Sequence, residues 1–425
     1  MIVELTGLDF ANASLLDESN AAAEAMALSF SVHNNNRKKF FVSKNLFPQS
    51  IDVCRTRAKA NGIDLVIGDI ADFPWSHAKE FCGAIFQNPD NIGNMENYTE
   101  LFAKFKENGI VSILSQDIMS TVISKPAGEM GADIAVGSAQ RFGLPMAFGG
   151  PHPGYMACKD EFKRKMPGRI IGVSRDKHGD LAYRMTLQTR EQHIRRDKAT
   201  SNICTAQNLL SNMTALYGIW HGPVGLKKIS TRIRFYTQML YTALQQLGIV
   251  VLTDKHNFFD TLVFDVKASG FSSADQVLAD FHKYGINLRK LDDNKVGISI
   301  NETTVILKLA TLVEIFALLL EKKDLGNTYL EDDFFTIQKY QDLHKNLKRS
   351  TEFMQQPVFN DLHSETEFMR YIHKICDKDY SLVNGMIPLG SCTMKLNSAA
   401  VMTPITFPGL CEIHPFAPKD QTEGY

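Results

Sequence analysis

The chain has 425 residues, of which 44% are hydrophobic and 22% are charged, and its formal net charge is −1. This length allows two or three domains, and the composition is ordinary for a globular protein. A net charge so close to zero creates no general attraction for nucleic acid or for an anionic membrane. The seven cysteines include no CxxC pair, which favours a reducing compartment over a disulfide framework.

No apolar run in the sequence is long enough to cross a bilayer. The best candidate covers residues 309–320, but it is short and contains Thr311 and Glu314, so we interpret it as a buried helix. The first ten residues, MIVELTGLDF, have the features of neither a secretory signal nor an arginine-rich transit peptide. We therefore expect no membrane span and no transit peptide in this chain.

The first half of the sequence alternates between helical and strand patterns, which predicts an α/β sheet with crossover helices. One helix is expected at residues 98–105, and another is expected to start with Ser14 as its N-cap. Short runs that are almost wholly apolar predict strands buried on both faces. These runs occupy residues 40–42, 65–67, 84–86, 111–114 and 134–136.

A long helical pattern starts near Thr200 and is expected to break at residues 221–223, before a second helix runs toward Leu247. Beyond it, a smaller α+β unit is expected. Residues 324–350 are polar and lack periodicity, which is typical of a bridge. The expected elements of the α+β unit are strands at residues 250–252, 262–264 and 296–300 and helices at residues 274–281 and 305–320.

The apolar strand at residues 134–136 leads into a polar turn within the block GADIAVGSAQRFGLPMAFGGPHPG. In pyridoxal-phosphate enzymes of the aminotransferase type, a strand and turn of this kind carry the lysine that holds the cofactor as a Schiff base. None of the side chains in this turn is an amine nucleophile, so the turn cannot form that bond. The turn consists of Ser138, Ala139, Gln140 and Arg141.

Together with three other blocks, this stretch resembles the N-terminal half of the glycine-cleavage P-protein family, the decarboxylating glycine dehydrogenases. The other blocks are ANASLLD (residues 11–17), LQTREQHIRRDKATSNICT (residues 187–205) and MIPLGSCTMKLN (residues 386–397). The family's fused form contains two homologous halves, and only the second half holds the lysine. The resemblance implies that this chain covers much of the first half and the start of the second, so it looks like a fragment.

The resemblance also implies an α/β fold, that of the fold-type-I transferases that depend on pyridoxal phosphate. In that fold, a large domain with a mostly parallel sheet is joined to a smaller α+β domain. We expect a large domain with a vestigial site at residues 1–228 and a small domain at residues 229–323. A bridging segment is expected at residues 324–378, and the beginning of the catalytic second half at residues 379–425.

Three residues are candidates for the vestigial cofactor site. Asp117 follows a strand, roughly where this fold places the partner of the pyridinium nitrogen, although such an aspartate is more often a turn or cap residue. The helix start at Ser14 could hold a phosphate, although helix caps far outnumber phosphate sites. Gln140 occupies the position of the Schiff-base lysine, and neither Lys125 nor Lys159 matches that position.

Thr200, Ser201 and Asn202 follow the most densely charged block of the chain and precede a helix. The resemblance implies that this segment reaches the cofactor phosphate of a neighbouring unit, for which hydroxyl groups and helix N–H groups are suitable donors. The alternative is a solvated, internally paired loop. Both interpretations remain open.

By resemblance, a turn of small residues and a later histidine border the active site of the second half. They are Ser391, Cys392, Thr393 and His414. Lys395 is not the Schiff-base lysine, which the family places far downstream. No metal site is expected, because Cys411 and His414 resemble only half of one.

In the complete P-protein, by resemblance, glycine loses carbon dioxide and its aminomethyl group passes to the lipoyl arm of the H-protein. We expect pyridoxal 5'-phosphate to be bound by the missing second half, and this chain alone to be inactive. The expected partners are lipoylated H-protein, other glycine cleavage proteins, and either a second fused chain in a homodimer or a separate catalytic half. The expected location is the mitochondrial matrix in a eukaryote and the cytoplasm otherwise.

Two further hypotheses remain. The chain could be a non-catalytic scaffold or subunit that pairs with a catalytic half, but the residues after Asp379 argue against this because they resemble the opening of that half. An ordinary aminotransferase that uses another lysine is disfavoured by the turn at Gln140.

Overall fold

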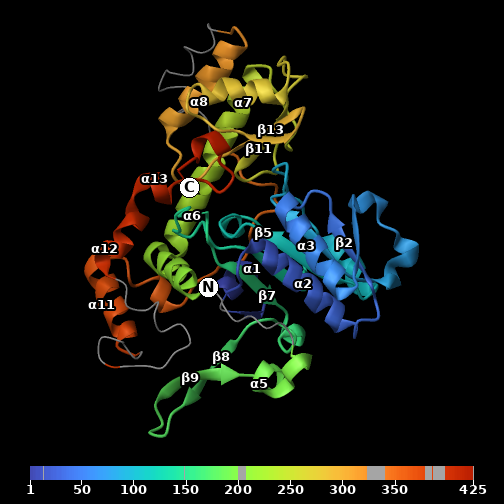
Figure 1. Cartoon of the computed structure of the whole chain (residues 1–425), viewed down its shortest axis with the longest axis vertical. Coiled ribbons are helices and arrows are strands. Elements are labelled where there is room, and N and C mark those ends of the chain that lie inside the picture. Colours follow the sequence, from blue (N-terminus) through green and yellow to red (C-terminus); the bar gives the residue numbers. More distant parts are fainter. Residues whose placement is uncertain are drawn as a thin grey trace.

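The computed structural model describes residues 1–12, 14–147, 149–199, 207–322, 340–378, 385 and 398–424. A seven-stranded sheet organises the larger of two domains (Figure 1). Its strand order is β1-β7-β6-β5-β4-β2-β3; β7 is antiparallel to both of its neighbours, and the other pairs are parallel. The strands are β1 (Phe10–Ala11), β2 (Lys39–Ser43), β3 (Asp64–Gly68), β4 (Phe81–Asn88), β5 (Val111–Gln116), β6 (Ile134–Ser138) and β7 (Gly154–Cys158).

Helices cover both faces of this sheet, which explains why its strands are apolar along most of their length. In β2, Phe40 and Val42 pack on one face and Phe41 packs on the other. All five strands predicted for this sheet are confirmed. One face packs against α2 (Glu18–Val32) and α3 (Pro48–Asn61), and the other against α1 (Ile2–Thr6), α4 (Thr99–Glu107) and α6 (Asn208–Gln246).

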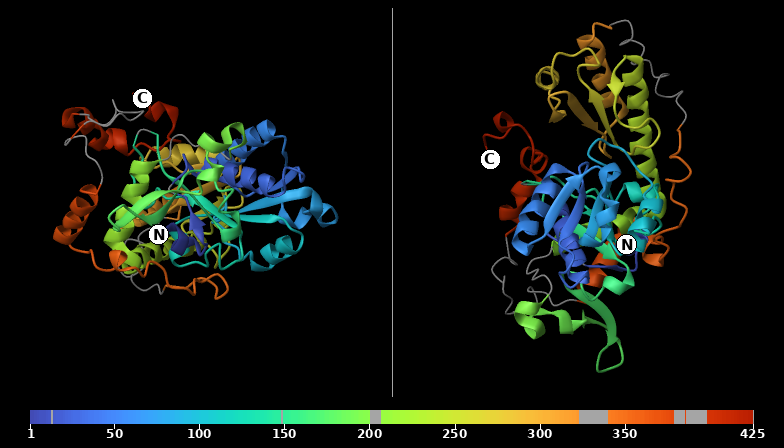
Figure 2. Two further views of the ribbon diagram at one scale, coloured as in Figure 1. Left: turned by 90° about the horizontal axis from the view of Figure 1, so that it is seen from below. Right: turned by 90° about the vertical axis from the view of Figure 1, so that its right-hand side faces the viewer.

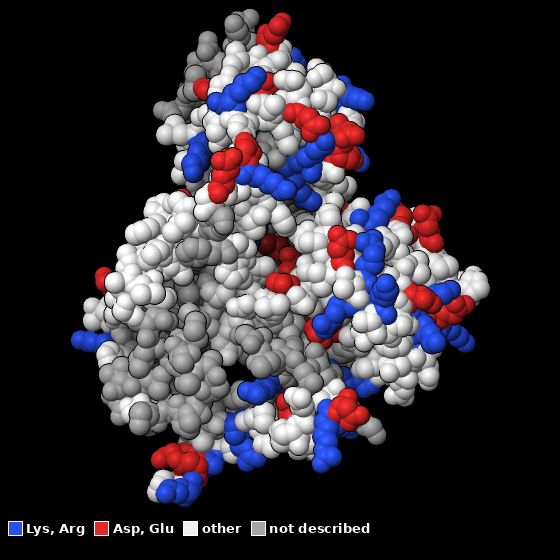
Figure 3. Space-filling view, viewed as in Figure 1, with Lys and Arg blue, Asp and Glu red and all other residues white. Residues whose placement is uncertain are grey.

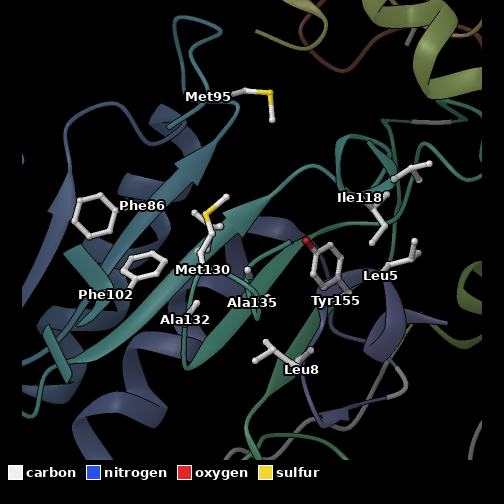
Figure 4. Packing of buried hydrophobic residues seen from close by; sticks show 14 of the residues in the cluster. Leu5, Leu8, Phe86, Met95, Phe102, Ile118, Met130, Ala132, Ala135 and Tyr155 are labelled. Carbon is white, nitrogen blue, oxygen red and sulfur yellow. The ribbon is translucent and has the colours of Figure 1, made fainter. Parts of the chain in front are cut away.

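An aromatic and aliphatic cluster fills the second face (Figure 4). Phe86 of β4 packs against Phe102 of α4, with ring centroids 6.1 Å apart. Tyr155 of β7 and Leu5 of α1 belong to the same cluster. This packing holds α1, α4 and the carboxyl ends of the central strands in one core.

The prediction that Ser14 caps the first long helix is wrong. Leu15 still pairs with Gly154 as an isolated bridge, so the backbone remains extended beyond Ser14. Helix α2 begins at Glu18, and its cap is Asp17, whose Oδ1 accepts a hydrogen bond from the Asn20 N–H at 2.7 Å.

Helix α6 belongs to both domains. Leu226 packs in the core of the large domain, whereas Leu240 and Leu244 pack in the core of the small domain. The predicted break is confirmed as a kink at Gly222, where φ is 58° and ψ is 179°. Since the predicted domain boundary at residue 228 falls inside this helix, the two domains share one element, which runs lengthwise in the right-hand view of Figure 2.

The small domain contains a four-stranded antiparallel sheet in the order β10-β11-β13-β12. The three strands and two helices predicted here are confirmed, whereas β12 was not predicted because its sequence, RKLD, is mostly polar. The elements are β10 (Val250–Val251), β11 (Thr261–Asp265), β12 (Arg289–Asp292), β13 (Lys295–Ser299), α7 (Ala274–His282) and α8 (Ile306–Leu319).

Further elements surround these two domains (Figure 1). The hairpin of β8 (Ile170–Arg175) and β9 (Leu181–Thr186) projects from the large domain, with Val173 and Tyr183 exposed. Within the described ranges, no helix is both long and apolar enough to span a membrane. The remaining helices are α5 (Gln192–Arg195), α11 (Glu365–Cys376), α12 (Ala399–Met402) and α13 (Pro408–Cys411). Helix α11 lies in the predicted bridging segment, for which no helix was predicted.

Gly222→Ala is expected to destabilise the protein, because the backbone of Gly222 is in a region that only glycine adopts readily. A Cβ at this position would also lie 2.4 Å from the carbonyl oxygen of Phe359. We expect a cost of about 1–3 kcal/mol from the backbone alone, seen as a lower midpoint of thermal unfolding.

The control for this prediction is Gly409→Ala in α13, where an added Cβ meets nothing within 4 Å. This variant should unfold at the wild-type midpoint. Equal midpoints for both variants would show that the kink does not need glycine.

Candidate functional site

The candidate site lies at the carboxyl edge of two neighbouring parallel strands. Asp117 directly follows β5, and Gln140 and Arg141 follow β6. Parallel strands bring the residues that follow them to one edge of the sheet, where α/β proteins form their sites. The segment after β1 reaches the same edge, because Gly154 pairs with both Leu15 and Ser138. The structure therefore places the three predicted vestigial residues around one edge.

Gln140 is held in the turn by its backbone. Its N–H donates to Ser138 Oγ at 3.1 Å, and its carbonyl oxygen accepts from the Leu144 N–H. Within the described part of the chain, the buried Nε2 of Gln140 has no hydrogen-bond partner. An amide is not a nucleophile, so this side chain cannot replace a Schiff-base lysine.

Arg141, the next residue, forms ion pairs with carboxylates at the site. Its Nη1 lies 3.0 Å from Asp117 Oδ2 and 2.5 Å from Asp260 Oδ2, and its Nη2 lies 3.7 Å from Glu302 Oε2. Burial alone would lower the pKa of the guanidinium, but the three carboxylates raise that pKa above its ordinary value. Arg141 therefore remains a cation beside Asp117.

Asp117 has a second role in the local backbone. Its Oδ1 accepts a hydrogen bond at 2.7 Å from the N–H of Ser120, the first residue of a short 3₁₀ helix (Ser120–Val122). One carboxylate oxygen thus caps a turn while the other binds Arg141. This is the turn or cap role that the sequence also allowed for Asp117.

At the start of α2, two backbone N–H groups have partners within the chain. The Glu18 N–H donates to His152 Nε2 at 3.1 Å, and the Asn20 N–H donates to Asp17 Oδ1. Two carboxylates, Asp17 and Glu18, also stand here, and they repel anions. The buried Oγ of Ser14 has no hydrogen-bond partner among the described residues. This helix start does not fit a phosphate group.

The nearby lysines do not complete the site. Lys125 Nζ donates to Thr99 Oγ1 at 3.0 Å. Lys159 pairs with Asp133 at 2.6 Å, and these residues follow β7 and precede β6, which places them at the opposite edge of the sheet. With no amine in the turn, an arginine on Asp117 and an acidic helix start, the described residues do not fit pyridoxal phosphate.

The surroundings of Glu18 at the start of α2 strongly raise the pKa of its carboxyl group. Burial, then Asp117 and Asp17, raise the pKa of Glu18 to about 7, and a hydrogen bond with Ser115 partly offsets the rise. An ionised Glu18 therefore costs stability near neutral pH.

The C-terminal segment packs on the turn after β6. The Ala147 N–H donates to the Cys411 carbonyl oxygen at 2.8 Å. His414 forms a local turn, in which its Nδ1 accepts from the Phe416 N–H at 3.0 Å. Among the described ranges, no three His, Cys, Asp or Glu side chains are grouped to bind a metal. The predicted interface residues outside the described residues are Thr200, Ser201, Asn202, Ser391, Cys392 and Thr393.

Sequence reasoning did not find the partners of Arg141. The arginine itself stood in the singled-out turn, but Asp260 lies 119 positions away and Glu302 still farther. No local pattern connects residues so distant in sequence. His152 stood within the same block as Gln140, but nothing in its spacing indicated that it would bond the start of α2.

Comparisons with known proteins agree with one another. The family described as "Glycine cleavage system P-protein" matches residues 1–316. The chain is 47% identical to a "Glycine dehydrogenase (decarboxylating)" of Nostoc punctiforme and 46% identical to a putative mitochondrial one of Schizosaccharomyces pombe. Both matches cover 100% of this chain but only 43% and 41% of those proteins, so the chain spans less than half of their length.

Solved structures give the same relationship. The fold is similar to a crystal structure of glycine decarboxylase (P-protein) in inhibitor-bound form, with a TM-score of 0.69 and 31% identity. That match covers 76% of this chain and 74% of the other. A cysteine desulfurase from Thermococcus onnurineus NA1 has a TM-score of 0.52 at 16% identity, covering 76% of this chain and 82% of the other. This similarity shows the fold alone, and it confirms the predicted fold-type-I architecture.

Glu18→Gln is expected to change how stability depends on pH. Because the pKa of Glu18 is raised on folding, its contribution to stability falls as pH increases from about 4.5 to about 7. At pH 8 the variant should be more stable than the wild type, by about 3 kcal/mol at most, and at pH 4.5 this gain should vanish. Thermal unfolding midpoints at both pH values measure the difference.

The matched control is Glu100→Gln, in the exposed first turn of α4. Glu100→Gln should show no gain in stability at pH 8, because an exposed carboxylate near a helix N-terminus is favourable. A Glu18→Gln effect that does not depend on pH would contradict the raised pKa of Glu18.

Proposed function

We propose that this chain, which belongs to the glycine cleavage system P-protein family, is the lysine-free half of a glycine-decarboxylating enzyme. In this proposal, the release of carbon dioxide from glycine takes place at a lysine-bearing half that binds pyridoxal 5'-phosphate. The aminomethyl group then passes to the lipoyl arm of an H-protein. The chemistry that the cofactor supplies is an electron sink for the bond that breaks.

The single observation that carries this proposal is the pair Gln140–Arg141 at the turn after β6. Gln140 removes the nucleophile from the position where this fold type has its lysine, and Arg141 binds Asp117. A vestigial site formed by Ser14, Asp117 and Gln140 is thus supported by the contacts as well as by the absence of an amine. By itself, the chain is proposed not to turn over glycine.

The contribution of this half to the reaction is structural in our proposal. In this proposal Thr200, Ser201 and Asn202 approach the cofactor phosphate of the lysine-bearing half, for which hydroxyl and backbone N–H groups are suitable donors. The segment with Ser391, Cys392, Thr393 and His414 borders the same active site. The packing of Cys411 on Ala147 supports this placement, since it holds the neighbouring His414 at the edge where the two halves would meet.

The proposed partners are lipoylated H-protein, the other glycine cleavage proteins and a lysine-bearing half, fused or separate. The proposed four-part division at residues 228, 323 and 378 applies with one element, α6, shared between the first two parts. The location proposed is the mitochondrial matrix in a eukaryote and the cytoplasm in a bacterium, where relatives of both kinds are known.

Reductive labelling tests whether this chain holds the cofactor. The chain is incubated with pyridoxal phosphate, reduced with borohydride and mapped by peptide mass spectrometry. We expect only scattered, substoichiometric labelling of surface lysines, because no lysine stands in the turn after β6. One lysine labelled stoichiometrically would overturn the proposal.

Complementation tests the role of the chain. The exchange of labelled carbon dioxide with glycine is measured in the presence of lipoylated H-protein, for this chain, for a lysine-bearing second half of a relative, and for the mixture. We expect no exchange with this chain alone and at least tenfold more exchange in the mixture than in the second half alone. A tenfold difference in rate corresponds to a change of about 1.4 kcal/mol in the activation barrier. Exchange by this chain alone would contradict the proposal.

A further inference from the structure

We propose that Arg141 is an ionic latch that fixes the orientation of the small domain on the large domain. The latch is defined as Arg141 with the carboxylates of Asp117, Asp260 and Glu302. This inference goes beyond the proposed function and does not depend on it, because the ion pairs themselves carry it.

The four residues of the latch come from both domains. Asp117 and Arg141 follow β5 and β6 of the large sheet, whereas Asp260 precedes β11 and Glu302 follows β13 of the small sheet. Because Thr261 pairs with Ser299, Asp260 and Glu302 lie at the same edge of the small sheet. In the space-filling view, acidic side chains gather in the hollow between the two domains (Figure 3).

The guanidinium of Arg141 contacts both domains at once. The same nitrogen, Nη1, donates to Asp117 Oδ2 of the large domain at 3.0 Å and to Asp260 Oδ2 of the small domain at 2.5 Å. The guanidinium carbon also lies 5.3 Å from the ring centroid of Phe259. A permanently charged group with several donors suits such a junction, because Nη1 bonds both aspartates while Nη2 is left to face Glu302.

The latch is partly buried, which strengthens the interactions among its charges. The four side chains are only 15% to 27% exposed, so solvent screens them less than it screens a surface pair. Three carboxylates around one cation would repel one another if Arg141 left. Moving the small domain away would separate Arg141 from Asp260 and leave that carboxylate without its cation. Burial raises the pKa of Asp260 and Asp117 adds to that rise, whereas Arg141 opposes it, so the contact with Arg141 offsets part of the cost of burying this carboxylate.

One bond of the latch is not formed. Arg141 Nη2 and Glu302 Oε2 are 3.7 Å apart, and in the described part of the chain neither atom has a hydrogen-bond partner. A small closing movement would bring these atoms within hydrogen-bond distance. Glu302 thus lies where a small movement of the domains would add another hydrogen bond to the latch.

Other polar contacts also join the domains, including hydrogen bonds from the guanidinium of Arg289 in β12 to the carbonyl and side-chain oxygens of Asn91. The Met95 N–H donates to the Asn257 carbonyl oxygen at 2.8 Å, and Thr253 Oγ1 donates to the Ile92 carbonyl oxygen at 2.7 Å. These bonds, together with the shared helix α6, keep the domains connected when the latch is broken. We therefore expect a loosened orientation rather than separation.

Hydrogen exchange of the full chain, followed by mass spectrometry, tests the latch with two isosteric variants. Asp260→Asn removes the negative charge from the bond between the domains, whereas Asp117→Asn removes it from the bond within the large domain and leaves the one to Asp260 ionic. For Asp260→Asn we expect exchange of residues 90–97 and 253–261 to accelerate about tenfold, because a charge-assisted bond is lost there. For Asp117→Asn we expect less than a twofold change in these segments.

The exchange of β4, β5 and α8 reports on the domain cores, and it should remain at wild-type rates in both variants. If Asp260→Asn does not fold, Arg141→Gln provides the same test, because it removes the positive charge that joins the two domains; exchange of the interface segments should again accelerate. Equal interface exchange in Asp260→Asn and Asp117→Asn, or acceleration spread evenly over the cores, would overturn the latch.

Discussion

One guanidinium lies among three partly buried carboxylates where the large and small domains meet, and the site at this edge depends on these contacts. Asp117 and Asp260 come from different sheets, and both are within hydrogen-bond distance of Arg141 Nη1. Carboxylates withdrawn from water need a cation or hydrogen bonds, since an isolated buried charge is very unfavourable. The chain supplies that cation itself, from the residue that follows Gln140. The turn that contains no amine is therefore also the turn that provides this cation.

The start of α2 likewise uses its polar groups for contacts within the chain. The N-terminus of a helix attracts anions because its first N–H groups are free. Here His152 and Asp17 accept from these groups, and Glu18 adds a further carboxyl group whose pKa is raised to about 7. The fold is thus retained while the groups that would bind a phosphate are used to hold the chain together. This is consistent with a half whose role in the proposed enzyme is structural.

Much of the fold could be predicted from local patterns, but the site contacts could not. The buried strands were found because Phe40, Phe41 and their equivalents form wholly apolar runs between two layers of helices. Gln140 was found because its turn is recognisable. In contrast, β12 and the β8–β9 hairpin are exposed and have weak patterns, and the bonds of Arg141 to Asp260 and Glu302 join residues more than a hundred positions apart. Ser14 was misassigned because pairing of Leu15 extends the strand conformation past the first suitable cap residue.

Helix α6 has a consequence for which changes of chain length the protein can accept. Each residue of an α-helix turns the following side chains by about 100° and advances them by about 1.5 Å. Leu226 must face one hydrophobic core while Leu240 and Leu244 face the other. Inserting or deleting a single residue between them would rotate the second set away from its core. The number of residues between Leu226 and Leu240 is therefore fixed by the helical repeat, because both leucines must point into their own cores.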